Sequence, residues 1–304
     1  MKLSTAVIDE LTVRPGSPAG LERRSTSETR ERWLGPLGHA HPKEVAAQDL
    51  EAFKRELEVA QDVLYASDTW AMLLVFQALD AAGKDGTIKH VMSGVNPLGC
   101  DVHAFRQPSP EELRHDFLWR CATRLPERGR IGIFNRSYYE EVLVVRVHPE
   151  LLAAQHLPAD SHAGPHLWKQ RYEDINAFER HLVHNGTRVI KFFLHVSKDE
   201  QRRRFLDRLD HPAKHWKFSA ADLAERAHFQ AYQEAYEDAL TQTSTTWAPW
   251  YVVPADHKPA MRALVGGIIV SVIDRLDLEY PRVDATQTEA FDRARRELEA
   301  DLGT

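Results

Sequence analysis

The stretch MLLVFQALDAAGKDGT, residues 72–87, decides the fold of this chain. Its first five residues form an unbroken apolar run, which is typical of a strand buried on both faces of a parallel sheet. Small residues and a Gly-Lys pair follow directly, and residues 88–95 continue in a mixed pattern that favours a helix. A buried strand, a small-residue loop and a helix in this order predict the phosphate-cradling arrangement of P-loop proteins.

The loop contains the residue types that phosphate binding needs. Small residues let backbone N–H groups surround an anion, and the positive end of the following helix points toward the same place. Lys84 would extend over the loop and offset charge on the phosphoryl oxygens. The alternative is an ordinary glycine-rich turn with solvated charges, but the strand before the loop and the helix after it favour a phosphate site.

The loop also departs from the usual P-loop pattern. Ala78 replaces the first glycine, and Asp85 replaces the Ser or Thr that normally holds Mg²⁺. Because carboxylate oxygens suit Mg²⁺, Asp80 and Asp85 are candidate metal ligands, with Mg²⁺ expected and Mn²⁺ as the alternative. Asp80 has a second candidate role, as the base that activates the acceptor, and the sequence leaves both roles open.

Length, charge and cysteine content narrow the class of protein. A chain of 304 residues allows one large α/β domain with extensions, and it contains no internal repeat. The net charge of −6 argues against a general nucleic-acid binder, although it allows a local basic channel. Cys100 and Cys121 lack metal-ligand spacing, which indicates a reduced compartment. No apolar stretch suits a signal peptide or a membrane span, so we expect a cytoplasmic protein that does not bind membranes.

The rest of the chain predicts one domain with an arm. Residues 1–42 are rich in Pro, Gly, Ser, Thr and charge, and we expect an extended arm that lies on the domain or on a neighbour. Residues 43–304 are expected to form a single domain. An amphipathic helix at residues 43–65 would serve either for packing or for oligomer contact. Further strands are predicted at residues 101–105, 131–134, 188–195 and 250–253, and further helices at residues 106–126, 168–185, 219–241, 259–276 and 287–302.

Polar residues follow a second predicted strand end. Asn135 and Arg136 come directly after the strand at residues 131–134. In an open α/β sheet, ligands gather at the carboxyl ends of the strands, and arginine suits phosphate. Many P-loop enzymes place a metal-positioning aspartate here, whereas Asn135 is neutral. The alternative is that both residues only form a turn.

A basic cluster at residues 202–218 interrupts an otherwise acidic chain. Arg204 and Arg208 are four residues apart and so share one face of a helix, while Arg202 points elsewhere. The cluster also contains Lys214 and Lys217, and it breaks at the hinge-like residues 210–212. We interpret it as a phosphate-binding lid, against the alternative of a solvated charged face.

Four separated segments resemble polyphosphate kinases of the second, P-loop family. The segments are QALDAAGKDGTIKHV (77–91), RQPSPEELRHDFLWR (106–120), IGIFNRSYYEEVLVVRVHPE (131–150) and DRLDHPAKHWKF (207–218). They agree in order, and the resemblance spans roughly residues 30–285. Asn135 within FNRSYYE is similar to the class III subgroup, whose members accept nucleoside mono- and diphosphates.

The resemblance implies a fold, an activity and a set of site residues. The implied fold is a thymidylate-kinase-like, three-layer α/β sandwich with a five-stranded parallel sheet and a helical lid. The implied activity is reversible transfer of a phosphoryl group from inorganic polyphosphate to ADP and AMP with Mg²⁺, in a homo-oligomer. The catalytic candidates are Asp80, Lys84, Arg136, Arg204 and Arg208. The candidates for binding phosphate or nucleotide are Ala81, Ala82, Gly83, Lys84, Asp85, Gly86, Thr87, Arg120, Asn135, Glu140, Lys214 and Lys217.

Two other functions remain open from the sequence. One is an ATP-dependent nucleotide kinase of similar fold, and the other is a polyphosphate-binding P-loop protein without turnover.

Overall fold

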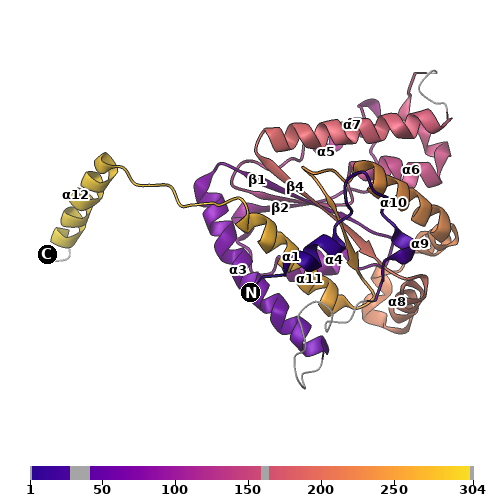
Figure 1. Cartoon of the computed structure of the whole chain (residues 1–304), viewed down its shortest axis with the longest axis horizontal. Coiled ribbons are helices and arrows are strands. Elements are labelled where there is room, and N and C mark those ends of the chain that lie inside the picture. Colours follow the sequence, from indigo (N-terminus) through magenta and orange to yellow (C-terminus); the bar gives the residue numbers. More distant parts are fainter. Residues whose placement is uncertain (1, 28–41, 159–163, 302–304) are drawn as a thin grey trace.

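The computed structural model describes residues 2–27, 42–158 and 164–301. Its centre is one sheet of five parallel strands in the order β2-β3-β1-β4-β5 (Figure 1). The strands are β1 (Ala71–Gln77), β2 (Cys100–Ala104), β3 (Ile131–Asn135), β4 (Thr187–His195) and β5 (Trp250–Pro254). All five predicted strands are confirmed, and each end lies within one residue of the prediction.

The remaining elements are helices and helical turns, where η marks a 3₁₀-helix. They are α1 (Thr5–Leu11), η1 (Leu21–Arg23), α3 (Pro42–Ser67), α4 (Lys84–Val91), η2 (Pro97–Gly99), η3 (Glu112–Arg114), α5 (Trp119–Ala122), η4 (Tyr138–Val142), α6 (Val144–Val147), η5 (Pro149–Gln155), α7 (Gly164–His184), α8 (Lys198–Asp210), η7 (Pro212–Lys217), α9 (Ala220–Glu225), η8 (Arg226–His228), α10 (Phe229–Thr243), α11 (Lys258–Asp274) and α12 (Ala285–Asp301). No helix in the described ranges has the length and apolar character needed to cross a membrane.

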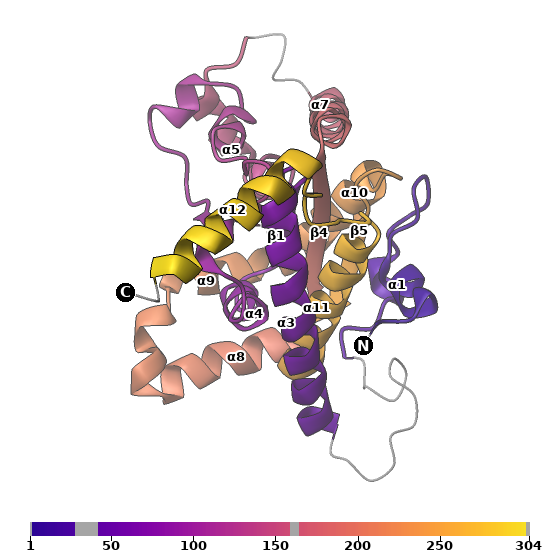
Figure 2. The same ribbon diagram turned by 90° about the vertical axis from the view of Figure 1, so that its left-hand side faces the viewer.

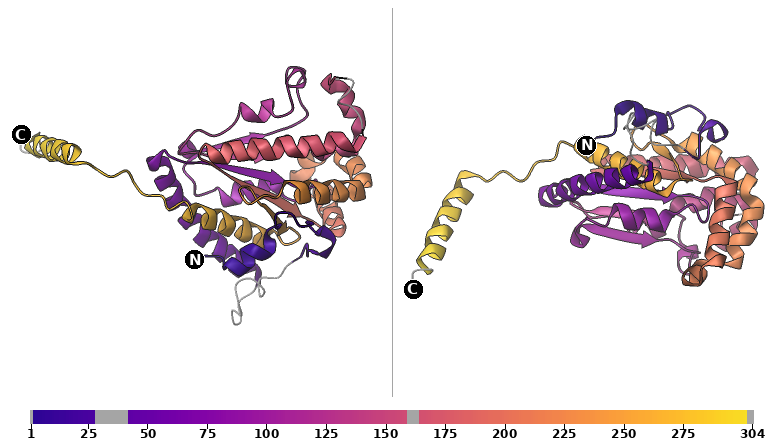
Figure 3. Two further views of the ribbon diagram at one scale, coloured as in Figure 1. Left: turned by 45° about the horizontal axis from the view of Figure 1, so that its top comes forward. Right: turned by 90° about the horizontal axis from the view of Figure 1, so that it is seen from below.

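Helices cover both faces of the sheet, which confirms the three-layer prediction. Helices α3, α4 and α11 lie on one face, and α7 and α10 lie on the other (Figures 1 and 3). Every residue of β1 is buried because it is covered from both sides. The predicted helix at residues 43–65 is a packing helix, since α3 lies along α11. The two helices approach each other closely: a Cβ atom at Gly267 of α11 would lie 2.8 Å from the Cζ atom of Phe53 of α3.

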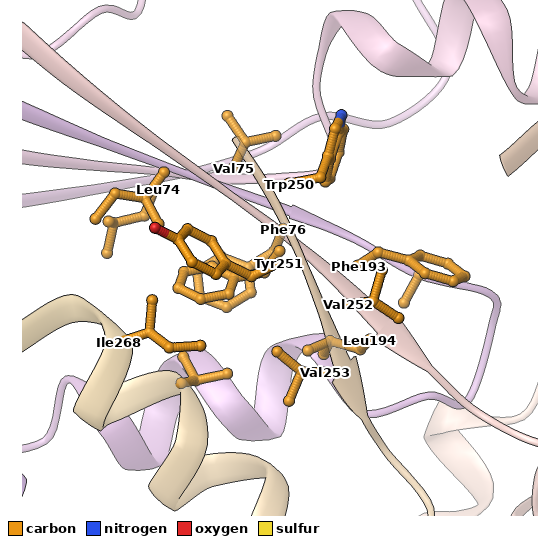
Figure 4. Close-up of a cluster of buried hydrophobic side chains, with 14 of the residues drawn as sticks. Leu74, Val75, Phe76, Phe193, Leu194, Trp250, Tyr251, Val252, Val253 and Ile268 are labelled. Atoms are coloured by element: carbon orange, nitrogen blue, oxygen red, sulfur yellow. The ribbon is translucent and has the colours of Figure 1, made fainter. Parts of the chain in front are cut away.

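The hydrophobic core is built from alternating side chains of the central strands (Figure 4). On β5, Trp250 lies on the same side of the sheet as Val75 of β1. The next side chain, Tyr251, points toward Ile268 of α11. The pleat of a strand sends successive side chains to opposite faces, so one strand contributes to both halves of the core.

A fully buried ion pair supports the segment after β3. Lys191 Nζ lies 2.6 Å from Glu179 Oε2, and neither side chain has exposed surface. The hydroxyls of Tyr138 and Tyr139 donate to the other oxygen of Glu179 at 2.9 and 2.8 Å. Because η4 begins at Tyr138, this network fixes the chain immediately after Arg136.

The predicted helix at residues 106–126 is wrong. A capping box does form within this range, since Ser109 N donates to Glu112 Oε2 at 2.7 Å and Glu112 N donates to Ser109 Oγ at 3.2 Å. Only the short turns η3 and α5 follow it. Asp116 Oδ1 accepts from Leu118 N at 2.9 Å, and this local bond replaces the helical pattern with a new turn.

The predicted single helix at residues 219–241 is also interrupted. The structure has α9, η8 and α10 in its place, with a 3₁₀ turn at Arg226–His228 between the two α-helices. The predicted helices at residues 168–185, 259–276 and 287–302 correspond to α7, α11 and α12.

The N-terminal segment lies on the domain beside β5 (Figure 2). Val13 N donates to Trp250 O at 2.9 Å, and Thr12 forms an antiparallel bridge with Tyr251. The segment includes α1 where the sequence predicted an extended chain, because Val7, Ile8 and Leu11 form a buried apolar face. Residues 28–41 of the predicted arm lie outside the described residues.

Helix α12 stands away from the body of the molecule (Figures 1 and 3). It has no buried residue, and the connecting residues 275–284 are largely exposed.

Candidate active site

The candidate site lies where β1 and β3 end side by side. The two strands pair in parallel, with Phe76 opposite Asn135. The chain leaves β1 toward one edge of the sheet and leaves β3 toward the other, so this is the point at which the strand order reverses. Open α/β sheets bind ligands at such points, as the sequence predicted.

The loop after β1 has the backbone conformation of an anion cradle. Ala81 has a φ of 61° and Gly83 has a φ of 108°, so both adopt the left-handed region. Gly83 is the N-cap of α4 and has no side chain to accept from the first amides of the helix. Those amides and the positive end of α4 are suited to a phosphate group. The Thr87 hydroxyl instead donates to Gly83 O at 3.0 Å, and its residue has no exposed surface.

Lys84 is folded back over the loop. Its Nζ atom donates to Ala78 O at 2.7 Å, and the residue is 8% exposed. Burial lowers the pKa of Lys84 to about 8, and the positive charge of Arg136 adds to that effect. The carboxylates of Asp80 and Glu140 act in the opposite direction. Lys84 is therefore placed at the cradle, and its ammonium group loses a proton more readily than that of an ordinary lysine.

Arg136 connects the two strand ends. Its Nη2 atom donates to Asp80 Oδ1 at 2.9 Å, and its Nη1 atom donates to Glu140 Oε2 at 3.3 Å. The charge of Glu140, assisted by Asp80, raises the pKa of Arg136 above its ordinary value despite burial. Asn135 Nδ2 donates to Asp85 Oδ1 at 2.7 Å. The structure thus brings together the residues predicted from the P-loop and those predicted from the end of β3.

The donor chemistry of Asp80 and Asp85 fits a magnesium ion that substrate helps to hold. Each carboxylate is engaged through one oxygen, Asp80 by Arg136 and Asp85 by Asn135. Within residues 2–27, 42–158 and 164–301 there is no cluster of three or more His, Cys, Asp or Glu that would hold a metal alone. Mg²⁺ in kinase sites takes one or two carboxylates together with substrate phosphates and water, which is the kind of set that these two residues offer.

Arg204 holds the phosphate loop through the backbone carbonyls of the loop. Its side chain is 4% exposed, and its five N–H donors all have protein acceptors. Nε donates to Glu200, and Nη1 donates to the carbonyls of Ala81 and Ala82. Nη2 donates to the carbonyls of Ala255 and Asp256, which follow β5. In this conformation Arg204 therefore contacts the loop backbone and has no N–H left for a phosphate.

The other cations of the predicted lid are engaged within the lid. Arg208 Nη1 donates to Lys217 O at 3.0 Å and lies 3.3 Å from Asp222 Oδ2. Lys214 Nζ donates to both carboxylate oxygens of Asp207, at 2.8 and 2.7 Å. The ammonium of Lys217 lies 4.9 Å from the ring centroid of Trp216, which is 79% exposed. The structure does not bring Lys214 or Lys217 into contact with the phosphate loop.

Arg120 lies at the end of the neighbouring strand β2. Its Nη2 atom donates to Arg106 O at 2.7 Å, and its guanidinium lies 5.3 Å from the ring centroid of Phe105. Phe105 N in turn donates to Asn135 O at 3.0 Å. Arg120 is thus connected to the end of β3 through one residue.

Two cations at the start of α11, Lys258 and Arg262, were not among the site residues predicted from the sequence. Arg262 Nη2 lies 3.5 Å from the position of a Cβ atom at Gly86, and its buried Nε has no hydrogen-bond partner. Burial and the charge of Arg204 lower the pKa of both Lys258 and Arg262. The unpaired guanidinium of Arg262 favours an anion beside the first turn of α4. The four-residue spacing of Lys258 and Arg262 in a helix that follows a buried strand was the signal available in the sequence.

The space between the phosphate loop and α10 is nearly closed. A cavity of about 40 Å³ is lined by Asp80, Arg136, Asp222, Tyr232 and Tyr236, among others. Pockets for nucleotide-sized ligands are on the order of 300 Å³ or more, so this cavity admits only water in the present conformation. Tyr232 and Tyr236 are buried, which indicates that they pack against the rest of the protein.

A parallel α/β sheet, a phosphate loop after its first strand and charged residues at the adjacent strand end define a P-loop kinase. Comparison with known proteins gives the family. The family model of Polyphosphate kinase 2 (PPK2) matches residues 40–281, which is most of the chain. The chain therefore belongs to the polyphosphate kinase 2 family, whose kinases generally need a divalent metal.

Individual relatives agree with this assignment. The ADP-polyphosphate phosphotransferase of Rhodopseudomonas palustris is 53% identical over 238 residues, covering 78% of this chain and 82% of that protein. The AMP/ADP-polyphosphate phosphotransferase of Meiothermus ruber is 46% identical over 240 residues, covering 79% and 85%. The crystal structure of Polyphosphate Kinase 2 from Arthrobacter aurescens TC1 superposes with a TM-score of 0.81 at 36% identity, covering 93% of this chain and 95% of that one.

Proposed function

We propose that this protein transfers a phosphoryl group from inorganic polyphosphate to ADP, forming ATP, that it also accepts AMP, and that the reaction is reversible. The observation that carries the proposal is the meeting of Lys84, Asp80 and Arg136 at the adjacent ends of β1 and β3. The names of the relatives from Rhodopseudomonas and Meiothermus supply the substrates.

The residues suit an in-line transfer in which the protein contributes position and charge. Phosphoryl transfer needs little covalent chemistry from the enzyme, so rate comes from alignment and from stabilising charge on the transferring group. The amides at the start of α4 and the ammonium of Lys84 would hold donor phosphates at the loop. Arg136, placed between the two strand ends, would offset charge on the transferring group.

The donor chain is proposed to continue from the loop toward the start of α11. Polyphosphate has no base or ribose to bind, so its recognition depends on cations arranged along its path. Arg262 lies next to the first turn of α4, and the contacts of the described residues give it no carboxylate partner within 4 Å. An anionic chain would supply the negative charge that Arg262 lacks.

Asp80 and Asp85 are the residues proposed to hold the divalent metal, with Mg²⁺ expected and Mn²⁺ as the alternative. The bound ion would supply positive charge to the phosphate oxygens. Asp80 also orients Arg136 through a bond of 2.9 Å, so its carboxylate has a role in the protein whether it is a metal ligand or the acceptor's base.

The nucleotide is proposed to require movement of the lid. The cavity beside Asp80 and Arg136 is too small for ADP, and one wall of it is made by Asp222 of α9 and by Gln201 of α8. Opening of α8, η7 and α9 would enlarge this space, and closure would exclude water that otherwise hydrolyses the donor.

The decisive experiment measures ATP with luciferase after mixing the protein with ADP, long-chain polyphosphate and Mg²⁺. ATP formation supports the proposal. Transfer from ATP to a nucleoside monophosphate without any use of polyphosphate would indicate an ordinary nucleotide kinase. Binding of polyphosphate without ATP formation would indicate a binding protein.

Two finer predictions accompany the proposal. Acceptance of AMP is tested by the same assay with AMP as the acceptor, and it follows from the resemblance around Asn135. The expected homo-oligomer is tested by light scattering on the protein as it leaves a sizing column.

A further inference from the structure

Asp256, which follows β5, joins three parts of the molecule. Its Oδ2 atom accepts from the Thr26 hydroxyl at 2.8 Å, and its N–H donates to Thr26 O at 2.9 Å. Its Oδ1 atom accepts from Ser197 N at 2.8 Å. Ser197 is the N-cap of α8, so one carboxylate connects the N-terminal segment to the start of the helix that carries Arg204.

The same residue also contacts the phosphate loop through Arg204. The backbone carbonyl of Asp256 accepts from Arg204 Nη2 at 3.2 Å, while Nη1 of the same guanidinium reaches Ala81 O at 3.0 Å. Ala81 is a non-glycine residue with a φ of 61°, a conformation that the surrounding structure must hold in place. Arg204 provides such a restraint. Through Ser197, Asp256 holds the N-terminal end of the helix that carries Arg204, and it also bonds to the Arg204 guanidinium itself.

The N-terminal segment, residues 2–27, is here called the strap. It is anchored at its beginning, where α1 and Val13 contact β5. In its middle, Glu237 accepts from the backbone N–H groups of Gly20 and Leu21 at 2.8 Å each. Apolar side chains of the strap are buried in the core up to Leu21, whereas a groove of about 1430 Å³ lies between the strap, α10 and the end of β4. Within the described part of the strap, Thr26 makes the contact that leads to the phosphate loop.

We propose that Asp256 is a positioning residue that couples docking of the strap to the geometry of the phosphate loop, acting through Arg204 and the first turn of α8. The catalytic consequence rests on the proposed function. With Thr26 bound, the Asp256 carboxylate is held between the strap and Ser197, and Arg204 is held against Ala81 and Ala82. Loss of the strap contact frees Asp256 to move and relaxes the loop that must align the donor phosphates.

The first test uses Thr26→Val, which removes the hydroxyl but keeps the size of the side chain. Thr26→Ser restores the hydroxyl. Thr12→Val is the matched control, because it removes a strap hydroxyl that bonds within α1, to Ile8 O, and does not touch Asp256. Amide hydrogen exchange of residues 78–87 is measured by mass spectrometry on the full chain without substrate. We expect exchange in Thr26→Val to be faster by about threefold or more, and exchange in the other two variants to match the unaltered protein.

The second test measures catalysis. We expect Thr26→Val to lower kcat for ADP with polyphosphate by about tenfold and to leave KM for ADP within about twofold, since alignment of the donor is lost while acceptor contacts remain. Thr26→Ser should restore kcat. A purely stabilising role would lower the melting temperature but would not change kcat per folded molecule, so assays are run well below that temperature.

A double-mutant cycle tests the route through Arg204. Arg204→Lys keeps a positive charge but loses the fork that bonds to the loop carbonyls. If the strap acts through Arg204, Thr26→Val should reduce kcat much less in the Arg204→Lys background than in the unaltered protein. Equal fold losses in both backgrounds would overturn the route.

The outcomes separate this inference from the proposed function. Equal exchange in Thr26→Val and Thr12→Val would overturn the role of Asp256, whatever the enzyme does. Absence of ATP formation by the unaltered protein would overturn the proposed function, and the exchange experiment would still decide whether the strap restrains the loop. Asp256→Ala gives an independent check, because it removes the acceptor of both Thr26 and Ser197 and should accelerate the same exchange more than Thr26→Val does.

Discussion

The ammonium group of Lys84 and the carbonyl oxygen of Ala78 lie 2.7 Å apart, across the two ends of the same loop. The lysine therefore already has a partner before a substrate arrives. A phosphate bound in the loop would compete with this carbonyl for the ammonium. The phosphate would displace the carbonyl, because a charged acceptor forms the stronger hydrogen bond.

Lys84→Ala should remove nearly all phosphoryl transfer. A positive charge at the donor phosphates is lost, and comparable contacts are worth about 10²- to 10³-fold in kcat. The measurement is luciferase-detected ATP from ADP and polyphosphate, with circular dichroism and melting temperature as controls for folding. A well-folded variant with unaltered turnover would show that residues 78–87 are not the phosphate site.

The pH dependence of kcat/KM should report the ammonium of Lys84. Its pKa in the free protein is lowered to about 8 by burial, so the charged form is lost as the pH rises through that value. We expect kcat/KM for long-chain polyphosphate to fall above pH 8, since the internal phosphates of such a chain are ionised throughout. A flat profile from pH 7 to 10 would contradict this prediction.

The lowered pKa of Lys84 is expected to reduce activity at high pH but has the opposite effect on the stability of the fold. The unfolded chain keeps the ordinary lysine value of 10.5, so between about pH 8 and that value it binds more protons at Lys84 than the folded protein does. The contribution of Lys84 to the free energy of unfolding therefore increases with pH across this window. A loss of activity above pH 8 would then not be explained by unfolding at this residue.

Asp80→Asn should reduce turnover sharply because the charge that holds Arg136 at 2.9 Å is lost. If Asp80 is mainly a metal ligand, raising Mg²⁺ should restore part of the rate, and if it is a base, extra metal should have no effect. Titration of kcat with Mg²⁺ distinguishes the two roles. Asp85→Asn is the matched variant, since Asp85 faces the neutral Asn135. Near-normal activity of Asp80→Asn at ordinary Mg²⁺ would exclude both roles.

The three arginines of α8 should differ in their importance. Arg204→Ala should cost about 10²-fold in turnover because the phosphate loop loses its restraint. Arg208→Ala should cost about tenfold because the contacts that join α8 to η7 and α9 are lost. Arg202 is 64% exposed and pairs only with Asp199 in the described ranges, so Arg202→Ala should stay within about twofold. Equal, small losses at all three positions would favour a solvated charged face.

The apparent KM for polyphosphate should rise more steeply with salt than the KM for ADP. A long polyanion contacts several cations at once and releases its counterions when it binds, as nucleic acids do. Arg262→Ala should reduce the salt slope for polyphosphate and leave that for ADP unchanged. Arg282→Ala is the control variant for Arg262→Ala, because Arg282 lies before α12 and pairs with Glu279. Equal salt slopes for the two substrates would contradict a basic donor path.

The strands were predictable because of how this sheet is buried. Each strand of a sheet covered on both faces appears as an apolar run, and residues 72–76 and 131–134 show it without interruption. Parallel pairing then places the residues after neighbouring strands close together. This geometry accounts for the contacts of Asp80 with Arg136 and of Asp85 with Asn135.

Side-chain direction was not predictable in the same way. The capping box at Ser109 and Glu112 gives the start of a helix, but the sequence did not show that Asp116 would form a competing turn. Helical spacing placed Arg204 and Arg208 on one face of a helix, yet whether Arg204 meets a phosphate or the loop backbone depends on carbonyls contributed by distant residues. The roles of Lys258 and Arg262 depend likewise on the packing of α11 against α4.

The bridge between Thr12 and Tyr251 affects how the protein can fold as it is synthesised. The strap is synthesised long before β5 and α10, the elements on which it docks. At about 5 to 20 residues per second, the interval is on the order of tens of seconds. During that time the apolar face of α1 lacks β5, the strand that α1 contacts in the folded protein. The nascent protein therefore exposes the apolar face of α1 until its sheet is complete, and chaperones that bind apolar helices would have a defined period in which to act.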